Sequence, residues 1–326
     1  MFRYILKRIL VTIPVLLGVT IVIFTLMFFT NGDPARLILG DTASDAEVAE
    51  LRESMGLNEP FINQYFNYMK GLFKGNLGIS YTTKLPVMDE IKVRLPVTAR
   101  LAFFSCLFAV CVGVPAGIIS AVRQYSVLDN FITVLALLGI TMPNFWLALL
   151  LILFFSVQLG WLPPSGLYGP LYYIMPVISI SAASVATITR MTRSSMLEVI
   201  RSDYIRTARA KGLSEGKVII RHGLKNALIP ILTVVGIQFA GGLSGAVVNE
   251  QVFAIPGLGK MMVDAIKSRN YPLVEGGVLI IALMCCIVNL AIDLMYAVAD
   301  PRIKSQYEHV RGKKKSKAEP APVREA

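Results

Sequence analysis

Charged side chains are scarce in this chain of 326 residues. Asp, Glu, Lys and Arg make up 16% of it, whereas soluble domains carry about 25%. Hydrophobic residues make up 55%, and the chain holds only four cysteines and two histidines. So little charge argues against an ordinary soluble domain, and so few cysteines and histidines argue against a disulfide scaffold or a zinc cluster.

Sequence motifs for catalysis are also missing. There is no Gly-x-Ser-x-Gly or His-Glu-x-x-His stretch, and His222 and His309 are too few to build a metal site. Residues 212–218 resemble a phosphate-binding loop, but three residues instead of four separate the glycines and no Ser or Thr follows the Lys. We therefore expect no catalytic residue, no metal site and no cofactor. Energy for uphill transport would come from an ion gradient or from another chain.

Long uncharged runs are what the chain has instead. A helix of about 20 apolar residues crosses the hydrocarbon core of a bilayer. The run 131–189 is long enough for two crossings with a turn at 160–166. With the other runs, at 9–32, 101–122, 230–249 and 276–299, the last interrupted only by Asp293, this predicts an all-α polytopic membrane protein with six transmembrane helices. The four cysteines, Cys106, Cys111, Cys285 and Cys286, fall inside these runs and act there as small apolar residues.

The connectors predict which ends face the cytoplasm. Lys and Arg exceed Asp and Glu at the N-terminal tip, in 190–229 and in the tail, and these segments fall on one side. Connectors 31–100, 158–172 and 250–275, on the other side, carry no such excess. Basic connectors stay in the cytoplasm, so we expect both termini inside. This topology accounts for the net charge of +11 without a nucleic-acid partner.

The external connector 31–100 carries helix signals. Ser44 can cap a helix over 46–56, a second helix is expected over 60–73, and a short third one starts at Pro86. These helices form either a packed cap over the spans or a docking surface for a soluble partner. The first run, 9–32, is longer than the apolar part of a signal peptide, so we interpret it as a retained helix.

Ionisable residues are rare inside the spans, which argues against an ion-coupled carrier. Asp293 is expected to cap a helix or to pair with a basic residue near the membrane surface. The uncharged polar residues Asn144, Gln238 and Asn249 are candidates for a translocation path. Each of them could equally form a hydrogen bond between helices.

The basic connector 203–213 is patterned beyond what joining two spans requires. Ile205, Ala208 and Gly212 share one helical face, and small residues there would let another surface approach closely. Gly212 can end the helix in a left-handed conformation, and Ser214 can start a second helix that runs to Pro230.

These segments carry a family resemblance. Residues 190–213 and 222–230 resemble the permease subunits of bacterial ATP-binding-cassette importers for dipeptides, oligopeptides and nickel, and most of all the first permease of a dipeptide system. Shorter matches are Gly32-Asp33-Pro34, Gly75 to Ser80, Arg94-Leu95-Pro96, Thr141-Met142-Pro143, Phe253 to Gly259 and Asp300-Pro301-Arg302.

The resemblance implies a type I importer permease fold in the bacterial inner membrane, and it implies partners. These are a second permease subunit, two cytoplasmic ATPase subunits, an external solute-binding protein and a peptide substrate. It also implies that the loop 190–229 couples to the ATPase through Tyr204, Ile205, Arg206, Thr207, Ala208, Arg209, Ala210, Lys211, Gly212 and Leu213. In the family's Glu-Ala-Ala…Gly pattern, this chain keeps Ala208 and Gly212 but has Arg206 for Glu and Thr207 for Ala.

A contact with the receptor is a further hypothesis on the external side. It would involve Phe253, Pro256, Gly257, Leu258 and Gly259, unless this segment is only a structural hairpin.

The expected division of the chain is an N-terminus at 1–8, a first span at 9–30, the connector 31–100, a permease core at 101–310 and a disordered basic tail at 311–326. Alternatives are an importer of nickel or another small solute, a stand-alone ion-coupled carrier, or a non-transporting membrane scaffold.

Overall fold

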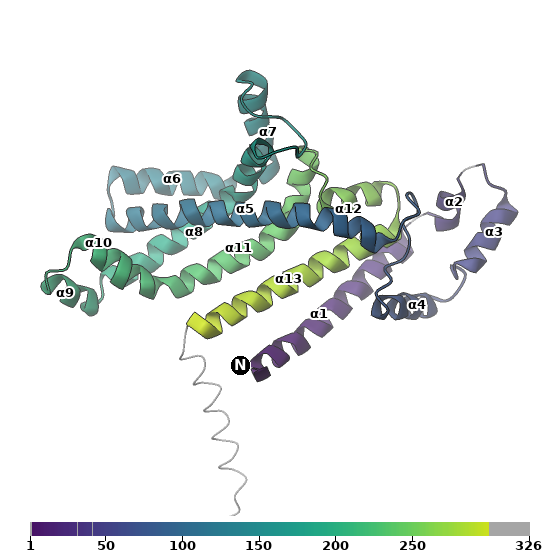
Figure 1. Cartoon of the computed structure of the whole chain (residues 1–326), viewed down its shortest axis with the longest axis horizontal. Helices are drawn as coiled ribbons and strands as arrows, with labels where there is room; N and C mark the ends of the chain where they lie inside the picture. Colours follow the sequence, from purple (N-terminus) through teal and green to yellow (C-terminus); the bar gives the residue numbers. More distant parts are fainter. Residues whose placement is uncertain (1, 31, 41, 300–326) are drawn as a thin grey trace, which may run out of the picture.

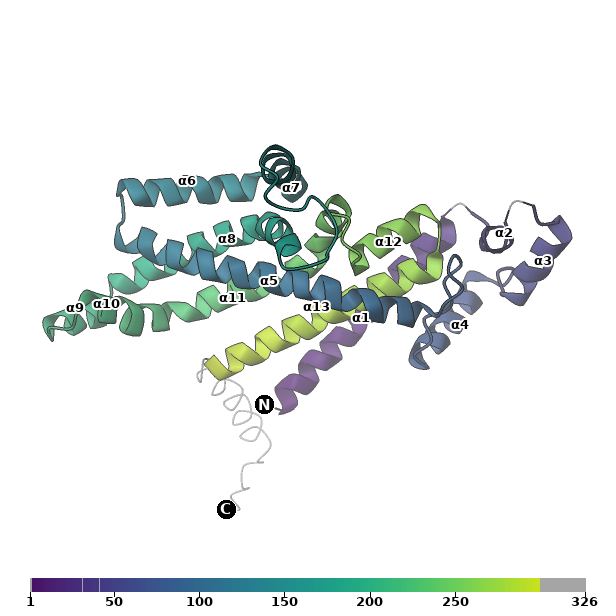
Figure 2. The same ribbon diagram turned by 45° about the horizontal axis from the view of Figure 1, so that its top comes forward.

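The computed structural model describes residues 2–30, 32–40 and 42–299, and this part of the chain is helical without a named strand. Three long helices lie side by side as the core: α5 (Val87–Val122), α8 (Leu171–Ile200) and α11 (Lys225–Val252) (Figures 1 and 2). Helix α6 (Val127–Thr141) packs against α8, and α13 (Tyr271–Ala299) packs against α11 and against α1 (Phe2–Phe29). The predicted tail 311–326 lies outside the described residues.

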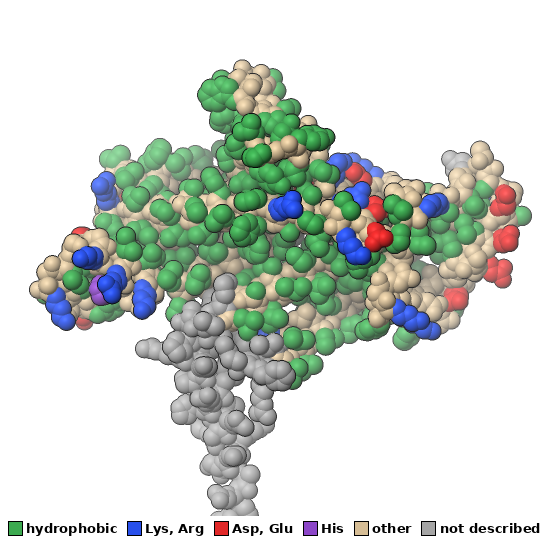
Figure 3. Space-filling view, viewed as in Figure 1, with side chains coloured by type: hydrophobic (Ala, Val, Ile, Leu, Met, Phe, Trp, Pro, Cys, Tyr) green, Lys and Arg blue, Asp and Glu red, His purple; other side chains and the backbone are tan. Residues whose placement is uncertain are grey.

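The two ends of the bundle differ in charge. One end, called here the α9 end, carries the short helix α9 (Asp203–Ala210). The opposite end, the α12 end, carries α12 (Leu258–Lys267) and the connector helices α2 (Pro34–Leu39), α3 (Asp45–Ser54) and α4 (Phe61–Phe73). Figure 3 shows hydrophobic side chains over the middle, basic side chains gathered at the α9 end and acidic ones along α3. This distribution is typical of a bundle that crosses a bilayer.

Five of the described helices are long and apolar enough to cross a membrane. A sixth crossing exists if α6 counts together with α7 (Asn144–Leu151) and the π-helical segment η1 (Ile152–Gln158), two pieces that meet at 106°. The bend falls at Met142 and Pro143, because proline lacks an N–H and forces the preceding residue into an extended conformation, here with ψ 125°. The six predicted crossings are therefore reached when this bent pair counts as one span, the third along the chain.

Helices α5 and α8 share the most extensive contact in the bundle, and glycines on α5 make it possible. A Cβ on Gly113 would lie 3.0 Å from Ile188 Cγ2, and one on Gly117 would lie 2.5 Å from Thr192 Cβ. Transmembrane helices gain little from hydrophobic burial against each other, so close backbone approach at small residues is a main source of their packing energy.

The connector to the first span folds partly as predicted. Ser44 and Glu47 form a capping box at the start of α3, and α4 begins after Pro60. Helix α2 was not predicted. The helix expected to be short at Pro86 is instead the first part of α5 and runs on through Pro96 to Val122, across the expected boundary at residue 100.

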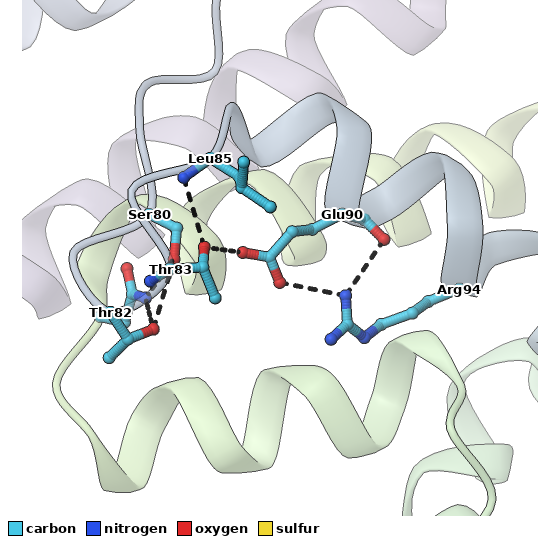
Figure 4. A network of polar contacts seen from close by, with 7 residues as sticks. Ser80, Thr82, Thr83, Leu85, Glu90 and Arg94 are labelled. Carbon is cyan, nitrogen blue, oxygen red and sulfur yellow. Dashed lines mark hydrogen bonds and ion pairs between the residues drawn. The ribbon is translucent and has the colours of Figure 1, made fainter.

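A polar network fixes the loop before α5 to the start of α13 (Figure 4). Asn270 donates to Ser80 Oγ at 2.8 Å and to Thr82 Oγ1 at 3.0 Å. The buried carboxylate of Glu90 accepts from Thr83 Oγ1 at 2.5 Å and from Arg94 Nη1 at 3.0 Å. The resemblance motifs around residues 75–80 and 94–96 therefore have a structural role at the α12 end.

Helix α1 lies along α13. Arg8 Nη2 pairs with Asp293 Oδ1 at 2.9 Å, which confirms the prediction that Asp293 meets a basic residue near a helix end. Near its other end, Phe24 contacts the rings of Phe61 and Tyr65 on α4. The first span is thus tied to the bundle at one end and to the connector at the other.

We expect Gly117→Leu to separate α5 from α8, because the added side chain would overlap Thr192 and the carbonyl of Thr189. Overpacking of this kind costs about 1–3 kcal/mol. The measurement is thermal unfolding of the purified protein in detergent. Gly18→Leu on α1 is the control, since nothing lies within 4 Å of its Cβ position. Equal unfolding temperatures for the two variants would contradict this account of the α5–α8 contact.

Candidate functional site

The predicted helix, glycine hinge and second helix are present at the α9 end. Helix α9 ends before Lys211, and Gly212 adopts φ +76°, a left-handed conformation that glycine reaches without steric cost. Helix α10 (Glu215–Lys217) then continues through the π-helical segment η2 (Val218–Leu224) into α11 without a break. The predicted second helix does not stop at Pro230, which lies inside α11. We call residues 203–217 the elbow.

One face of α9 is buried inside the chain. Ile205 and Ala208 pack with Val218 and Val199, and Ile205 and Val218 are fully buried. From the sequence, this face of small residues was predicted to contact a partner. In the structure it packs instead against the end of α8 and the start of η2, and so holds α9 in place. The remaining predicted coupling residues are exposed: Tyr204, Arg206, Thr207, Arg209, Ala210, Lys211, Gly212 and Leu213. Any partner therefore meets the face that carries Tyr204, Thr207 and Lys211.

An ion pair spans the hinge. Arg209 donates from Nη2 to Glu215 Oε1 at 2.6 Å and from Nε to Oε2 at 3.1 Å. These hydrogen bonds to a carboxylate raise the pKa of the Arg209 guanidinium above its ordinary value. Arg206, which replaces the family's Glu, lies on the exposed side 4.0 Å from Asp203. The pair between Arg209 and Glu215 keeps α9 and α10 in a fixed relation across Gly212.

The three predicted path residues lie apart from one another. Asn144 is the first residue of α7, just after the bend, and Gln238 is half-buried on α11. Asn249 is fully buried and accepts a hydrogen bond from Ser179 Oγ at 2.8 Å, so in this conformation it joins α11 to α8. Its Nδ2 has no partner within the described part of the chain. A path role for these three residues stays a prediction.

A pocket of about 560 Å³ lies between α6, α8 and α11 in the half of the bundle nearer the α9 end. Three positions at helical spacing on α8, Thr187, Arg190 and Ser194, provide much of its polar wall. The complete lining is Thr133, Thr187, Arg190, Met191, Arg193, Ser194, Leu197 and Val234. Sequence reasoning missed this pocket, although the hydroxyls one turn to either side of Arg190 were a signal.

One wall of the pocket is held by an ion pair between the buried Asp129 and the half-buried Arg193. Arg193 donates from Nε and Nη2 to the two carboxylate oxygens of Asp129, each at 2.8 Å. The Asp129 side chain also accepts from Ser120 Oγ and from the Tyr125 N–H, so its charge is fully compensated. A bidentate Arg–carboxylate pair has a fixed geometry, and this one joins α6 to α8.

A buried carboxylate organises the α12 end. Glu250 on α11 is fully buried, accepting from Thr98 Oγ1 at 2.6 Å and from the Lys260 N–H at 2.9 Å. Thr98 Oγ1 in turn accepts from the Leu258 N–H at 2.8 Å. A Cβ on Gly257 would lie 2.3 Å from the Glu250 carboxyl carbon. The glycine at 257 is thus explained by the carboxylate beside it, which ties α5, α11 and α12 together.

The residues proposed for receptor contact lie beside these polar contacts of Glu250. Phe253, Gly257, Leu258 and Gly259 are buried, and Pro256 is exposed. Burial places four of the five within the chain's own packing, and a contact with a receptor through Pro256 stays a prediction.

A second cavity, of about 330 Å³, lies nearby between α1, the connector and α13, with Glu275 in its wall. Among the described residues, no three His, Cys, Asp or Glu side chains are grouped to hold a metal ion.

We expect Glu250→Gln to loosen the α12 end, because the amide group replaces one of the acceptor oxygens and leaves a buried donor unpaired. A buried donor or acceptor without a partner costs about 1–3 kcal/mol. Thermal unfolding in detergent measures the effect, with Glu50→Gln on the exposed face of α3 as the control. If Glu250→Gln unfolds at the temperature of the unaltered protein, this carboxylate does not hold the three helices together.

Comparison with known proteins gives consistent results. The chain matches the family of binding-protein-dependent transport system inner membrane components over residues 113–305, and the N-terminal model of the same family over residues 1–102. It is 45% identical to the dipeptide transport system permease protein DppB of Alkalihalophilus pseudofirmus, with 93% of this chain and 100% of the relative covered.

More distant similarities agree. The chain is 42% identical to the glutathione transport system permease protein GsiC of Escherichia coli, with 93% of this chain and 99% of the relative covered. The inward-facing methionine transporter MetNI shares the fold at 19% identity, with a TM-score of 0.54 over 65% of this chain and 97% of the other. The chain is therefore a member of the family of inner-membrane permease components of binding-protein-dependent transport systems.

Proposed function

We propose that this chain forms one half of the membrane path of an ATP-driven peptide importer. The elbow carries the proposal: a short helix, clamped by Ile205 and Ala208 and hinged at Gly212, presents an exposed basic face at one end of the bundle. A stand-alone carrier has no need of such a surface. The names of the relatives, which transport dipeptides and glutathione, favour a di- or oligopeptide over nickel as the substrate.

Charge supports the orientation. The α9 end is the basic end, so by the positive-inside rule it faces the cytoplasm, and the α12 end faces outward. The ion pair between Arg8 and Asp293 keeps the start of α1 beside the last turns of α13, so in this topology the first and last described residues lie on the cytoplasmic side. ATP is available there, which is the side where a coupling surface is useful.

The partners follow from this arrangement. ATPase subunits bind the elbow, a second permease subunit completes the path, and a solute-binding protein docks at the α12 end, where Pro256 is exposed. The family's dependence on a binding protein supports the external partner. The solvent-facing connector helices α2 and α3 enlarge the surface on that side.

Alternating access needs a connection between the ATPase and the helices that line the path. Val199 at the end of α8 and Val218 at the start of η2 both pack on the buried face of α9. A displacement of α9 therefore moves α8 and α11 together, whereas a loop without these contacts would move alone. A two-state change from almost all inward to almost all outward requires about 5.5 kcal/mol of differential binding, which ATP and the loaded receptor together would supply.

We expect Gly212→Val to abolish most ATP-driven peptide uptake, while the transporter still assembles and hydrolyses ATP. A β-branched side chain is strained at φ +76°, by about 1–2 kcal/mol, so α9 would tilt out of its position on the ATPase. The measurement is uptake and ATP hydrolysis by the reconstituted transporter with its binding protein.

Gly75→Val, in the connector at the opposite end of the bundle, is the matched control. Gly75 is also exposed, adopts φ +75° and has no atom within 4 Å of its Cβ position, so the variant introduces the same backbone strain outside the elbow. The control should transport normally. Normal coupling in Gly212→Val, or equal losses in both variants, would count against the elbow as the coupling surface.

A further inference from the structure

The pocket between α6, α8 and α11 contains one uncompensated charge. Of the two arginines in its wall, Arg193 is neutralised by its bidentate pair with Asp129. Arg190 is exposed and makes no hydrogen bond or ion pair with any residue that the structure describes. The pocket therefore offers a single free guanidinium beside a fixed, charge-balanced wall.

Arg190 was counted in the cytoplasmic connector 190–229, but the structure places it inside α8, ten residues before the helix ends at Ile200. A guanidinium at this position cannot lie against lipid tails at low cost. A charged side chain in the hydrocarbon region is tolerated where it reaches water or an opposite charge. The side of α8 that packs on α5 is a different one, which carries Ile188 and Thr192. The face with Arg190 therefore points into a hydrated space or at an anion.

The surroundings of Arg190 select the type of anion. Ser194 lies one turn away from it and can donate a hydrogen bond, whereas the Thr187 hydroxyl, one turn to the other side, donates to the Ala183 carbonyl at 2.8 Å. Met191 and Leu197 make the adjacent wall apolar. One cation, one available hydroxyl donor and an apolar patch suit a monovalent carboxylate that carries a small or apolar side chain. A phosphate, with its larger charge, would face a single uncompensated cation here.

We propose that this pocket binds the C-terminal α-carboxylate of a peptide on its way through the permease, with Arg190 as the charged anchor. The inference rests on the proposed function, and it adds which end of the substrate is recognised. Guanidinium and carboxylate groups match in geometry and form two parallel hydrogen bonds. The volume of about 560 Å³ falls in the range of about 300–1,000 Å³ that is usual for small-molecule sites.

The location gives the site a role in transport. The pocket is walled by α8, whose last turn packs on α9, and by α11, which continues from the segment η2 that packs on α9. A movement of the elbow therefore changes the spacing of the walls. The carboxylate is held while the pocket is open towards the cytoplasmic half of the path, and it leaves when α8 and α11 shift.

The test is peptide binding to the complete transporter in nanodiscs, without nucleotide and without the binding protein, so that the external receptor does not contribute to selectivity. The probes are radiolabelled Ala-Ala and its C-terminal amide, measured by equilibrium dialysis at up to millimolar concentration. We expect the unaltered transporter to bind Ala-Ala at least about tenfold more tightly than the amide, because the charged hydrogen bonds are lost with the amide.

Arg190→Gln should lower the affinity for Ala-Ala about tenfold and leave that for the amide unchanged, and Arg190→Lys should restore part of the loss. Arg100→Gln, an exposed arginine on α5 outside the pocket, should change neither affinity. Equal binding of acid and amide by the unaltered transporter, or no measurable binding of Ala-Ala, overturns the proposal. Dissociation of the permease subunits in Arg190→Gln also overturns it, since Arg190 would then pair with an acidic group of the second subunit.

The proposed function fails separately. If proteoliposomes with ATP and the loaded binding protein import no peptide, the importer assignment is wrong. If they import peptides but the nanodisc assay finds no preference for the carboxylate, only the assignment of the pocket is wrong.

Discussion

The close approach of α5 and α8 is the constraint on which the other features depend. Gly113 and Gly117 leave no room for a Cβ against Ile188 and Thr192, so α8 is fixed on one side along much of its length. Inside a bilayer such packing replaces the hydrophobic driving force that is absent between lipid-embedded helices. With that side used for packing, the opposite side of α8 carries the pocket with Arg190, and its last turn carries the contact with α9.

Two groups of polar contacts join the helices of the bundle, one near each end. At the α12 end, Glu250 binds Thr98 on α5 and the backbone at the start of α12. Nearer the α9 end, Asp129 and Arg193 join α6 to α8. Helix α8 runs to the elbow directly and α11 is joined to it through η2, and Val199 and Val218 pack there on the same face of α9. The arrangement lets force at the elbow reach the pocket through packed helices, while the ends stay connected.

The sequence was sufficient where the determinant is local. Uncharged runs predicted the spans. Gly212 predicted the left-handed hinge, because that conformation depends only on the backbone angle φ of the glycine itself. The sequence was insufficient where the structure of a segment depends on contacts with residues far away in the chain. The helix that was expected to be short at Pro86 runs on through Pro96 as part of α5. The face of Ile205 and Ala208, which was predicted to meet a partner, is covered by Val199 and Val218. The role of Glu250 had no local signal in the sequence, because Thr98, which binds it, is 152 residues away.

The most direct test of the account is a photo-cross-link from the exposed face of the elbow. A photoreactive amino acid at Thr207 in the assembled transporter should form an adduct with the ATPase subunit, and the yield should change when ATP is added. The same amino acid at Ile62, exposed on α4 at the opposite end, should form none with the ATPase. An adduct of Thr207 with the external binding protein, or of Ile62 with the ATPase, would contradict both the orientation and the coupling role.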